Sequence, residues 1–197
     1  MPGTIYTIGH SNHDLQGFVD LLLRHRIEVL VDVRSQPYSA YATQFASAPL
    51  QEALAAAGVR YLFLGRELGG RPRDPSCYDP DGRVDYGRVA ATTLFQGGIA
   101  RLRRGIARYR IALLCAEENP AGCHRRRLVG RVLQEAGVAV LHIRGSGELE
   151  PEEAIAARER GTGDQLSLFG TGAAEPWKSL QPVPRRAGDR AHDTRAG

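Results

Sequence analysis

Short apolar runs alternate with helical patterns along residues 5–143. The runs have the length and the Val, Ile and Leu content of buried strands, and they are Ile5–Ile8, Val29–Val33, Tyr61–Leu64, Ile111–Leu114 and Val138–Ile143. Strands that are buried on both faces and joined by helices form parallel sheets. The pattern therefore predicts an α/β fold, a three-layer Rossmann-like sandwich with a mostly parallel sheet of about five strands and helices on both faces.

Four helices are expected between and after these strands. They cover residues 15–23, 47–57, 86–109 with an interruption at Gly97–Gly98, and 123–136. Ser11 or Asn12 is the expected cap of the first helix, and Gly58 ends the second. Beyond these elements the alternation stops. We expect an α/β catalytic domain over residues 1–145, a short helical extension over 146–160 and a disordered tail over 161–197.

The composition fits a cytoplasmic protein. Of the 197 residues, 42% are hydrophobic, which is enough for a core, and no apolar run reaches the length of a membrane span. The N-terminus enters a strand-like segment without a basic region or an apolar signal ahead of it. Three cysteines are an odd number, which argues against a disulfide framework. We expect no contact with membranes.

Positive charge is concentrated in the expected domain. Residues 1–144 hold 19 Arg or Lys and 13 Asp or Glu, whereas residues 145–197 hold 7 and 9. Nearly all of the positive charge is Arg, which is the better bidentate ligand of phosphate. A basic domain fits nucleic acid or another polyanion.

Polar residues follow each expected strand. Open parallel sheets bind their ligands at the carboxyl ends of the strands, so these residues are predicted to share one site. The expected catalytic residues are His10, Asp32, Glu117 and His124. The expected substrate-binding residues are Ser11, Arg34, Ser35, Gly69, Gly70, Cys123 and Arg125.

Each candidate also has a structural interpretation. Asp32 could be the partner of Arg34, which lies on the same side of the strand by period-two alternation, or it could be a general base. Glu117 could be a solvated loop carboxylate. His10 could cap the helix that follows it.

The segment around Cys123 allows several kinds of chemistry. At a helix N-terminus, Cys123 would have a lowered pKa and become a reactive thiolate. The same backbone amides, together with Arg125, could hold a phosphate. Cys115 is expected to be a packing residue.

Zinc binding is a further alternative for this segment. It would use Cys115, Cys123 and His124, with Glu117 or His10 as the fourth ligand. The gap of eight residues between the two cysteines is not a standard zinc spacing, so we expect no metal.

These segments together resemble the bacterial and archaeal family known as domain of unknown function 488. The resemblance covers about residues 4–144 and rests on Thr7–Ser11, Asp32–Pro37, Leu68–Gly70, Leu114–Glu117 and Cys123–Arg125. It implies a compact α/β domain whose site is built from these motifs. The family is defined by its sequence rather than by a reaction.

A pentapeptide near the C-terminus resembles the motif by which bacterial DNA repair and replication enzymes bind the sliding clamp. The sequence QLSLF stands in a polar, Gly-rich segment, and its expected anchors are Gln165, Leu166, Leu168 and Phe169. A few anchors of this kind carry most of the affinity in short-motif recognition. The resemblance implies that the sliding clamp is a partner.

The leading functional hypothesis is a DNA glycosylase that removes a damaged or modified base. Base excision needs a carboxylate, from Asp32 or Glu117, and donors such as His10 or Arg34 that neutralise the leaving base. It requires no metal and no organic cofactor. The alternatives are a metal-dependent nuclease or phosphoesterase, a non-catalytic adaptor recruited to the clamp, and a transferase that uses Cys123.

Overall fold

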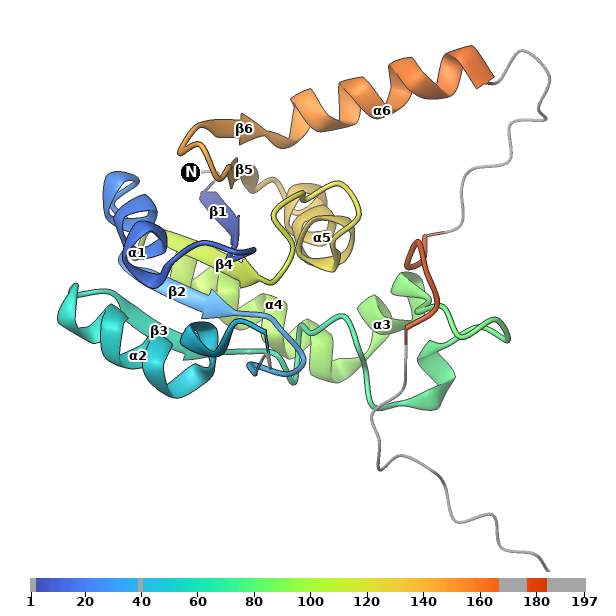
Figure 1. Ribbon diagram of the computed structural model, residues 1–197. Coiled ribbons are helices and arrows are strands. Elements are labelled where there is room, and N and C mark those ends of the chain that lie inside the picture. The colour runs from blue at the N-terminus through green and yellow to red at the C-terminus, as the bar shows by residue number, and fades with distance from the viewer. Residues whose placement is uncertain (1–2, 39–40, 167–176, 184–197) are drawn as a thin grey trace, which may run out of the picture.

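A computed structural model describes residues 3–38, 41–166 and 177–183 of the chain, apart from the side chains of residues 161–166. Its centre is one sheet with the strand order β3-β2-β4-β1-β5-β6 (Figure 1). Five strands are parallel and lie where the sequence predicts them: β1 Thr4–Gly9, β2 Val29–Asp32, β3 Arg60–Phe63, β4 Ile111–Cys115 and β5 Ala139–Ile143. The predicted α/β sandwich is confirmed.

Helices cover both faces of this sheet. On one face, α1 (Leu15–Arg24) and α2 (Ser47–Ala56) pack on Ile8, Leu30 and Leu114. On the other face, Ile5, Val31 and Leu113 form a core with residues of α3, α4 and the helical segment after β4. These elements are α3 (Tyr86–Ala91), α4 (Thr93–Ile106), the π-helix η3 (Arg125–Gly130) and α5 (Arg131–Glu135). Because side chains alternate along each strand, neighbouring residues serve opposite cores.

The helix expected over residues 86–109 is divided at a different place from the one predicted. Thr92, not Gly97–Gly98, separates α3 from α4, and its hydroxyl caps α4 by accepting a hydrogen bond from the Phe95 amide. Gly98 serves close packing instead, since a Cβ there would lie 2.8 Å from the side chain of Leu68. The cap of α1 also differs, because Asp14 accepts from the Gly17 amide at 2.7 Å.

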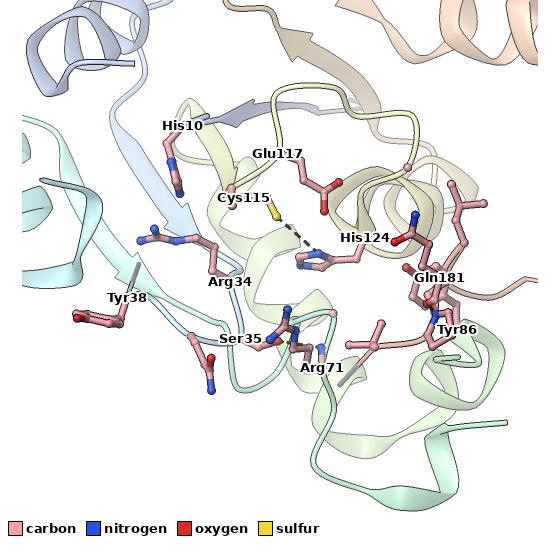
Figure 2. A pocket seen from close by; sticks show the side chains of 18 residues that line it. His10, Arg34, Ser35, Tyr38, Arg71, Tyr86, Cys115, Glu117, His124 and Gln181 are labelled. Carbon is pink, nitrogen blue, oxygen red and sulfur yellow. Dashed lines mark hydrogen bonds between the residues drawn. The ribbon is translucent and has the colours of Figure 1, made fainter. Parts of the chain in front are cut away.

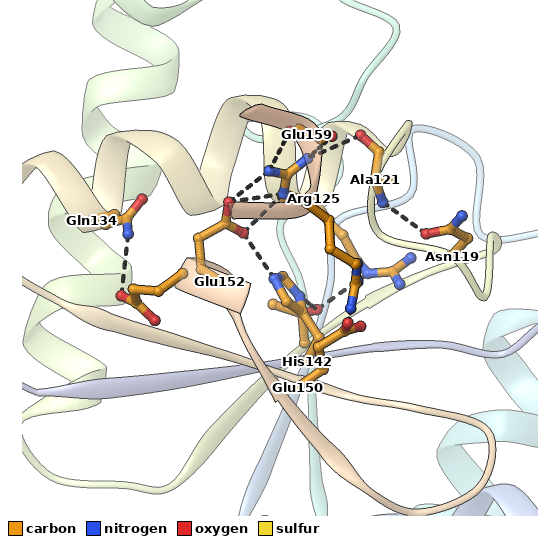
Figure 3. Close-up of polar contacts among 12 residues, drawn as sticks. Asn119, Ala121, Arg125, Gln134, His142, Glu150, Glu152 and Glu159 are labelled. Atoms are coloured by element: carbon orange, nitrogen blue, oxygen red, sulfur yellow. Dashed lines mark hydrogen bonds and ion pairs between the residues drawn. The ribbon is translucent and has the colours of Figure 1, made fainter. Parts of the chain in front are cut away.

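The chain after β5 is more ordered than the sequence predicts. A short strand, β6 (Leu149–Pro151), pairs antiparallel with β5, and α6 (Glu152–Leu166) follows it. Arg126 of η3 binds Glu152 and Glu159 of α6, and Glu152 also accepts from His142 of β5 at 2.9 Å (Figure 3). These ion pairs attach α6 to the domain, which binary patterning of the sequence does not reveal.

Residues 177–183 return to the domain beside α3 (Figure 1). The indole of Trp177 donates to the Arg127 carbonyl at 2.6 Å, Lys178 pairs with Asp79 at 2.8 Å, and Ser179 is buried. The sequence predicts that these residues belong to a disordered tail. Instead, the hydrogen bond of Trp177 and the ion pair of Lys178 hold them on the domain. In the clamp-like motif, Gln165 and Leu166 end α6, whereas Leu168 and Phe169 lie outside the described residues.

The described helices include none that combines the length and the apolar character needed to span a bilayer.

Candidate functional site

A pocket of about 710 Å³ opens at the carboxyl edge of the sheet (Figure 2). Its walls come from the ends of β1, β2 and β4, from the loop after β3, and from the returning segment 177–183. The lining residues include His10, Arg34, Ser35, Tyr38, Gly70, Arg71, Tyr86, Cys115, Glu117, His124 and Gln181. The size is within the usual range of small-ligand sites.

Asp32 lies beneath this pocket and does not line it. Its side chain is fully buried and accepts hydrogen bonds from the Arg34 amide at 3.0 Å, from Arg34 Nη2 at 2.6 Å and from the Tyr61 hydroxyl at 2.8 Å. These donors occupy both oxygens of the carboxylate. The structure therefore places Asp32 as the partner of Arg34, which is the structural alternative, outside the lining of the pocket.

Arg34 and Arg125 have different surroundings although both were expected to bind substrate. Arg34 lines the pocket while Asp32 holds its guanidinium. Arg125 is fully buried and donates to Thr7 Oγ1 at 3.2 Å and to the carbonyls of Glu117 and Glu118. All three of its nitrogens face protein acceptors, so Arg125 holds the loop after β4 against β1 and does not reach a substrate phosphate.

His10 lines the pocket and has a defined orientation. Its ring stacks on Phe45 with 4.5 Å between centroids, and Nδ1 donates to the Ser11 carbonyl at 3.0 Å. The neutral ring then carries its lone pair on Nε2. Burial lowers the pKa of His10 from its ordinary value. Ser11 has a left-handed backbone, with φ of 45°, and does not line the pocket.

Cys115, Cys123 and His124 form one cluster. The Sγ atoms of Cys115 and Cys123 lie 3.7 and 4.0 Å from His124 Nδ1, while His124 Nε2 donates to the Val33 carbonyl at 3.0 Å. Cys115 and His124 line the pocket. From the sequence, Cys123 was expected in the site and Cys115 in the packing of the core. The structure places Cys115, not Cys123, in the pocket wall.

The two thiols differ in acidity. A hydrogen bond from Cys123, with the charge of His124, holds the pKa of Cys115 well below its ordinary value. Burial and the neighbouring Cys115 raise the pKa of Cys123 well above its own. Burial opposes ionisation of His124, but Cys115 raises its pKa overall. All three cysteines of the chain are free thiols, as expected.

Glu117 projects into the pocket near this cluster (Figure 2). Among the described residues that line the pocket, it is the only carboxylate. Burial, followed by the charge of Cys115, raises the pKa of Glu117. Its main chain is fixed by Arg125, so the carboxylate projects from a rigid loop.

The expected glycines act through close packing. A Cβ at Gly70 would lie 2.7 Å from His124 Cγ, and one at Gly69 would meet the Ser35 side chain. Ser35 Oγ accepts from the Arg71 amide at 2.9 Å. These contacts allow the loop after β3 to pass closely over His124, and Gly70, not Gly69, reaches the pocket wall.

The lining contributed by residues 179–183 was missed by the sequence analysis. No local pattern indicates it, because these residues mix polar and apolar types and are held at the pocket by contacts with distant segments. The contacts include those of Trp177 and Lys178 and the hydrogen bond from the Ser179 amide to the Val84 carbonyl at 2.8 Å.

A family model described as domain of unknown function DUF488 matches residues 14–132. The chain belongs to this family. Searches of curated proteins and of solved structures find no match. The DUF488 region contains the Cys115–Cys123–His124 cluster, Glu117 and Arg34, whereas His10 and residues 177–183 lie outside it. The DUF488 pocket is thus completed by segments from both ends of the described chain.

Proposed function

We propose that this pocket is the active site of a DNA-processing hydrolase that excises a damaged or modified base. The observation that carries the proposal is the position of Glu117, the single carboxylate among the described lining residues, in a pocket that two arginines, Arg34 and Arg71, also line. A carboxylate that faces a basic pocket suits hydrolysis of a bond next to a phosphate-bearing sugar.

The pocket chemistry supports a nucleotide unit as its occupant. Arginine guanidinium groups bind phosphate oxygens, and two tyrosines, Tyr38 and Tyr86, line the same space. A base inside a duplex would have to be extruded to reach Glu117. We assign Glu117 to accept a proton from the attacking water, and the guanidinium of Arg34 to donate hydrogen bonds to the leaving base.

The test compares two neighbouring carboxylates. Purified protein is incubated with end-labelled oligonucleotides that carry uracil, hydroxymethyluracil, hypoxanthine, oxidised or alkylated bases, and half of each sample is treated with alkali. We expect alkali-dependent cleavage at one lesion, lowered about 10²-fold or more by Glu117→Gln. Glu118→Gln is the matched control, because that carboxylate pairs with Arg144 outside the pocket.

Strand scission without alkali would contradict base excision and indicate a nuclease. Equal activity of the Glu117→Gln variant would remove Glu117 from the reaction. Retention of DNA binding with no cleavage of any substrate would favour the adaptor hypothesis.

We further propose, from the sequence QLSLF alone, that the chain is recruited to the sliding clamp. Leu168→Ala with Phe169→Ala should abolish binding to immobilised clamp and leave activity on short oligonucleotides unchanged. Equal clamp binding by the double variant would exclude the motif as the docking site.

A further inference from the structure

We propose that Cys115, Cys123 and His124 bind a zinc ion at the wall of the pocket. One ligand atom from each residue lies within 4.8 Å of the other two. Zinc with bonds of about 2.3 Å to sulfur and about 2.1 Å to nitrogen separates tetrahedral S and N ligands by about 3.6 Å. The observed S-to-Nδ1 distances of 3.7 and 4.0 Å are close to that value.

The orientation of His124 is the second observation. Its Nε2 donates to the Val33 carbonyl at 3.0 Å, so in the neutral ring the lone pair is on Nδ1, the nitrogen that lies near both sulfurs. A carbonyl that orients the far nitrogen of an imidazole is the usual outer-shell partner of a zinc-bound histidine. Gly70 packs against the same ring and limits its rotation.

The backbone explains how an eight-residue gap brings the cysteines together. Cys115 ends β4, one of the inner strands of the sheet, and Cys123 stands just before η3. The loop that joins the two cysteines contains Glu117 and Glu118, and Arg125 donates hydrogen bonds to both of their carbonyls. These bonds fold the loop back on itself. The spacing of the cysteines in the sequence is unusual for a zinc site, but the folded loop brings the three ligand atoms within 4.8 Å of one another.

The open side of the cluster faces the pocket. Three protein ligands leave a fourth position, which catalytic zinc sites give to water. Cys115 and His124 line the pocket together with Glu117, whereas Cys123 lies behind them. A zinc ion there would lower the pKa of a bound water, and Glu117 is the carboxylate placed to accept its proton. Only this last consequence rests on the proposed hydrolase function; the metal site does not.

The test measures metal directly in the full-length protein. Protein purified without chelator should contain about one zinc ion per chain, measured by inductively coupled plasma mass spectrometry. Cobalt(II) added to zinc-free protein should give the visible bands of tetrahedral thiolate coordination. Cys115→Ser, Cys123→Ser and His124→Ala should each weaken zinc binding at least tenfold in competition with a chromophoric chelator.

Cys77→Ala is the matched control. Cys77 is also a buried free thiol, but it belongs to the core beneath α3 and should keep full zinc content when changed. Wild-type protein that takes up no zinc or cobalt, while Cys115 reacts rapidly with iodoacetamide, would overturn the proposal and indicate a thiolate–imidazolium pair. The wild-type measurements need no variant to fold.

The outcomes separate the two proposals. Zinc binding without base excision would retain the metal site and remove the glycosylase. Base excision by a protein that binds no zinc would remove the metal site alone.

Discussion

At the scale of single residues, two carboxylates at strand ends have opposite surroundings. Asp32 is fully buried beneath three donor groups from Arg34 and one from Tyr61, whereas Glu117 projects into the pocket. The donors decide the difference, because a carboxylate that is saturated by the protein has no position left for a substrate. Asp32 positions Arg34, and Glu117 is the carboxylate that lines the pocket.

Asp32→Asn should therefore act mainly on stability. Removing one member of a buried ion pair leaves the Arg34 charge uncompensated, and we expect a loss of about 3–5 kcal/mol in the free energy of unfolding. Urea denaturation measures it. Tyr61→Phe, which removes one hydrogen bond to the same carboxylate, should cost about 1–3 kcal/mol. Unchanged stability of Asp32→Asn would contradict this assignment.

Gly70→Ala should damage the pocket and leave the remaining fold in place. Its methyl group would lie 2.7 Å from His124 Cγ and would displace the ring, so affinity for zinc and for substrate should fall. Gly97→Ala is the control, since a Cβ there meets no atom within 4 Å. In α4 it should raise stability by about 0.5–1 kcal/mol, measured by thermal unfolding.

At the scale of elements, the helical segment after β4 connects the site with α6. It begins as the π-helix η3. This geometry is rare in proteins, and where it occurs it is often close to a functional site. Within it, Arg125 fixes the loop of Glu117, and Arg126 joins Glu152 and Glu159 of α6. Neighbouring arginines thus hold the loop of Glu117 and helix α6.

Arg126→Met should release α6. Arg126 and Glu152 expose 8% and 10% of their side chains, so the loss leaves a buried charge and should cost about 3–5 kcal/mol. Hydrogen exchange of the α6 amides should rise most. Arg158→Met provides the contrast, because Arg158 is 63% exposed in its pair with Glu150 and should change stability by about 1 kcal/mol or less.

The ion pair between Glu118, in the loop after β4, and Arg144 should make the free energy of unfolding fall at acid pH. The hydrogen bond from Arg144 lowers the pKa of Glu118 below its ordinary value. Stability from this pair is therefore present above the pKa of the unfolded chain and is lost as pH falls through the lower folded pKa. Unfolding free energy measured against pH should decline less steeply on the acid side in Arg144→Gln. An identical acid slope in both proteins would exclude this pair as a cause.

At the scale of the whole molecule, the pocket is closed by a segment remote in sequence from the sheet. Trp177 packs beside Tyr86 and under the guanidinium of Arg131, and residues 179–183 then form one wall of the pocket. The sheet positions the reactive groups, while this segment limits access to them.

Trp177→Ala should detach that wall. The stability loss should stay below the about 3–5 kcal/mol typical of a fully buried tryptophan, but substrate affinity should fall because residues 179–183 lose their anchor. Calorimetry and KM measure the two effects. Leu180→Ala is a control for stability, since Leu180 is 52% exposed. Unchanged KM in Trp177→Ala would show that the wall does not contact substrate.

Local patterns in the sequence are sufficient to predict the five parallel strands, the helices on both faces, and which residues end the strands at the edge of the sheet where the pocket lies. Periodicity and strand burial are properties of neighbouring residues, so they can be read without a structure. His10, Glu117 and His124 reach the pocket for this reason.

Only the tertiary structure decided which candidates face that pocket. Besides its bonds from Arg34, Asp32 accepts from Tyr61, 29 residues away, and besides its bonds to the loop after β4, Arg125 donates to Thr7, 118 residues away. The cysteine pair, β6 and the wall formed by residues 179–183 likewise depend on contacts between distant segments. Hydrogen-bond partners and burial are set by such contacts, which spacing along the chain does not encode.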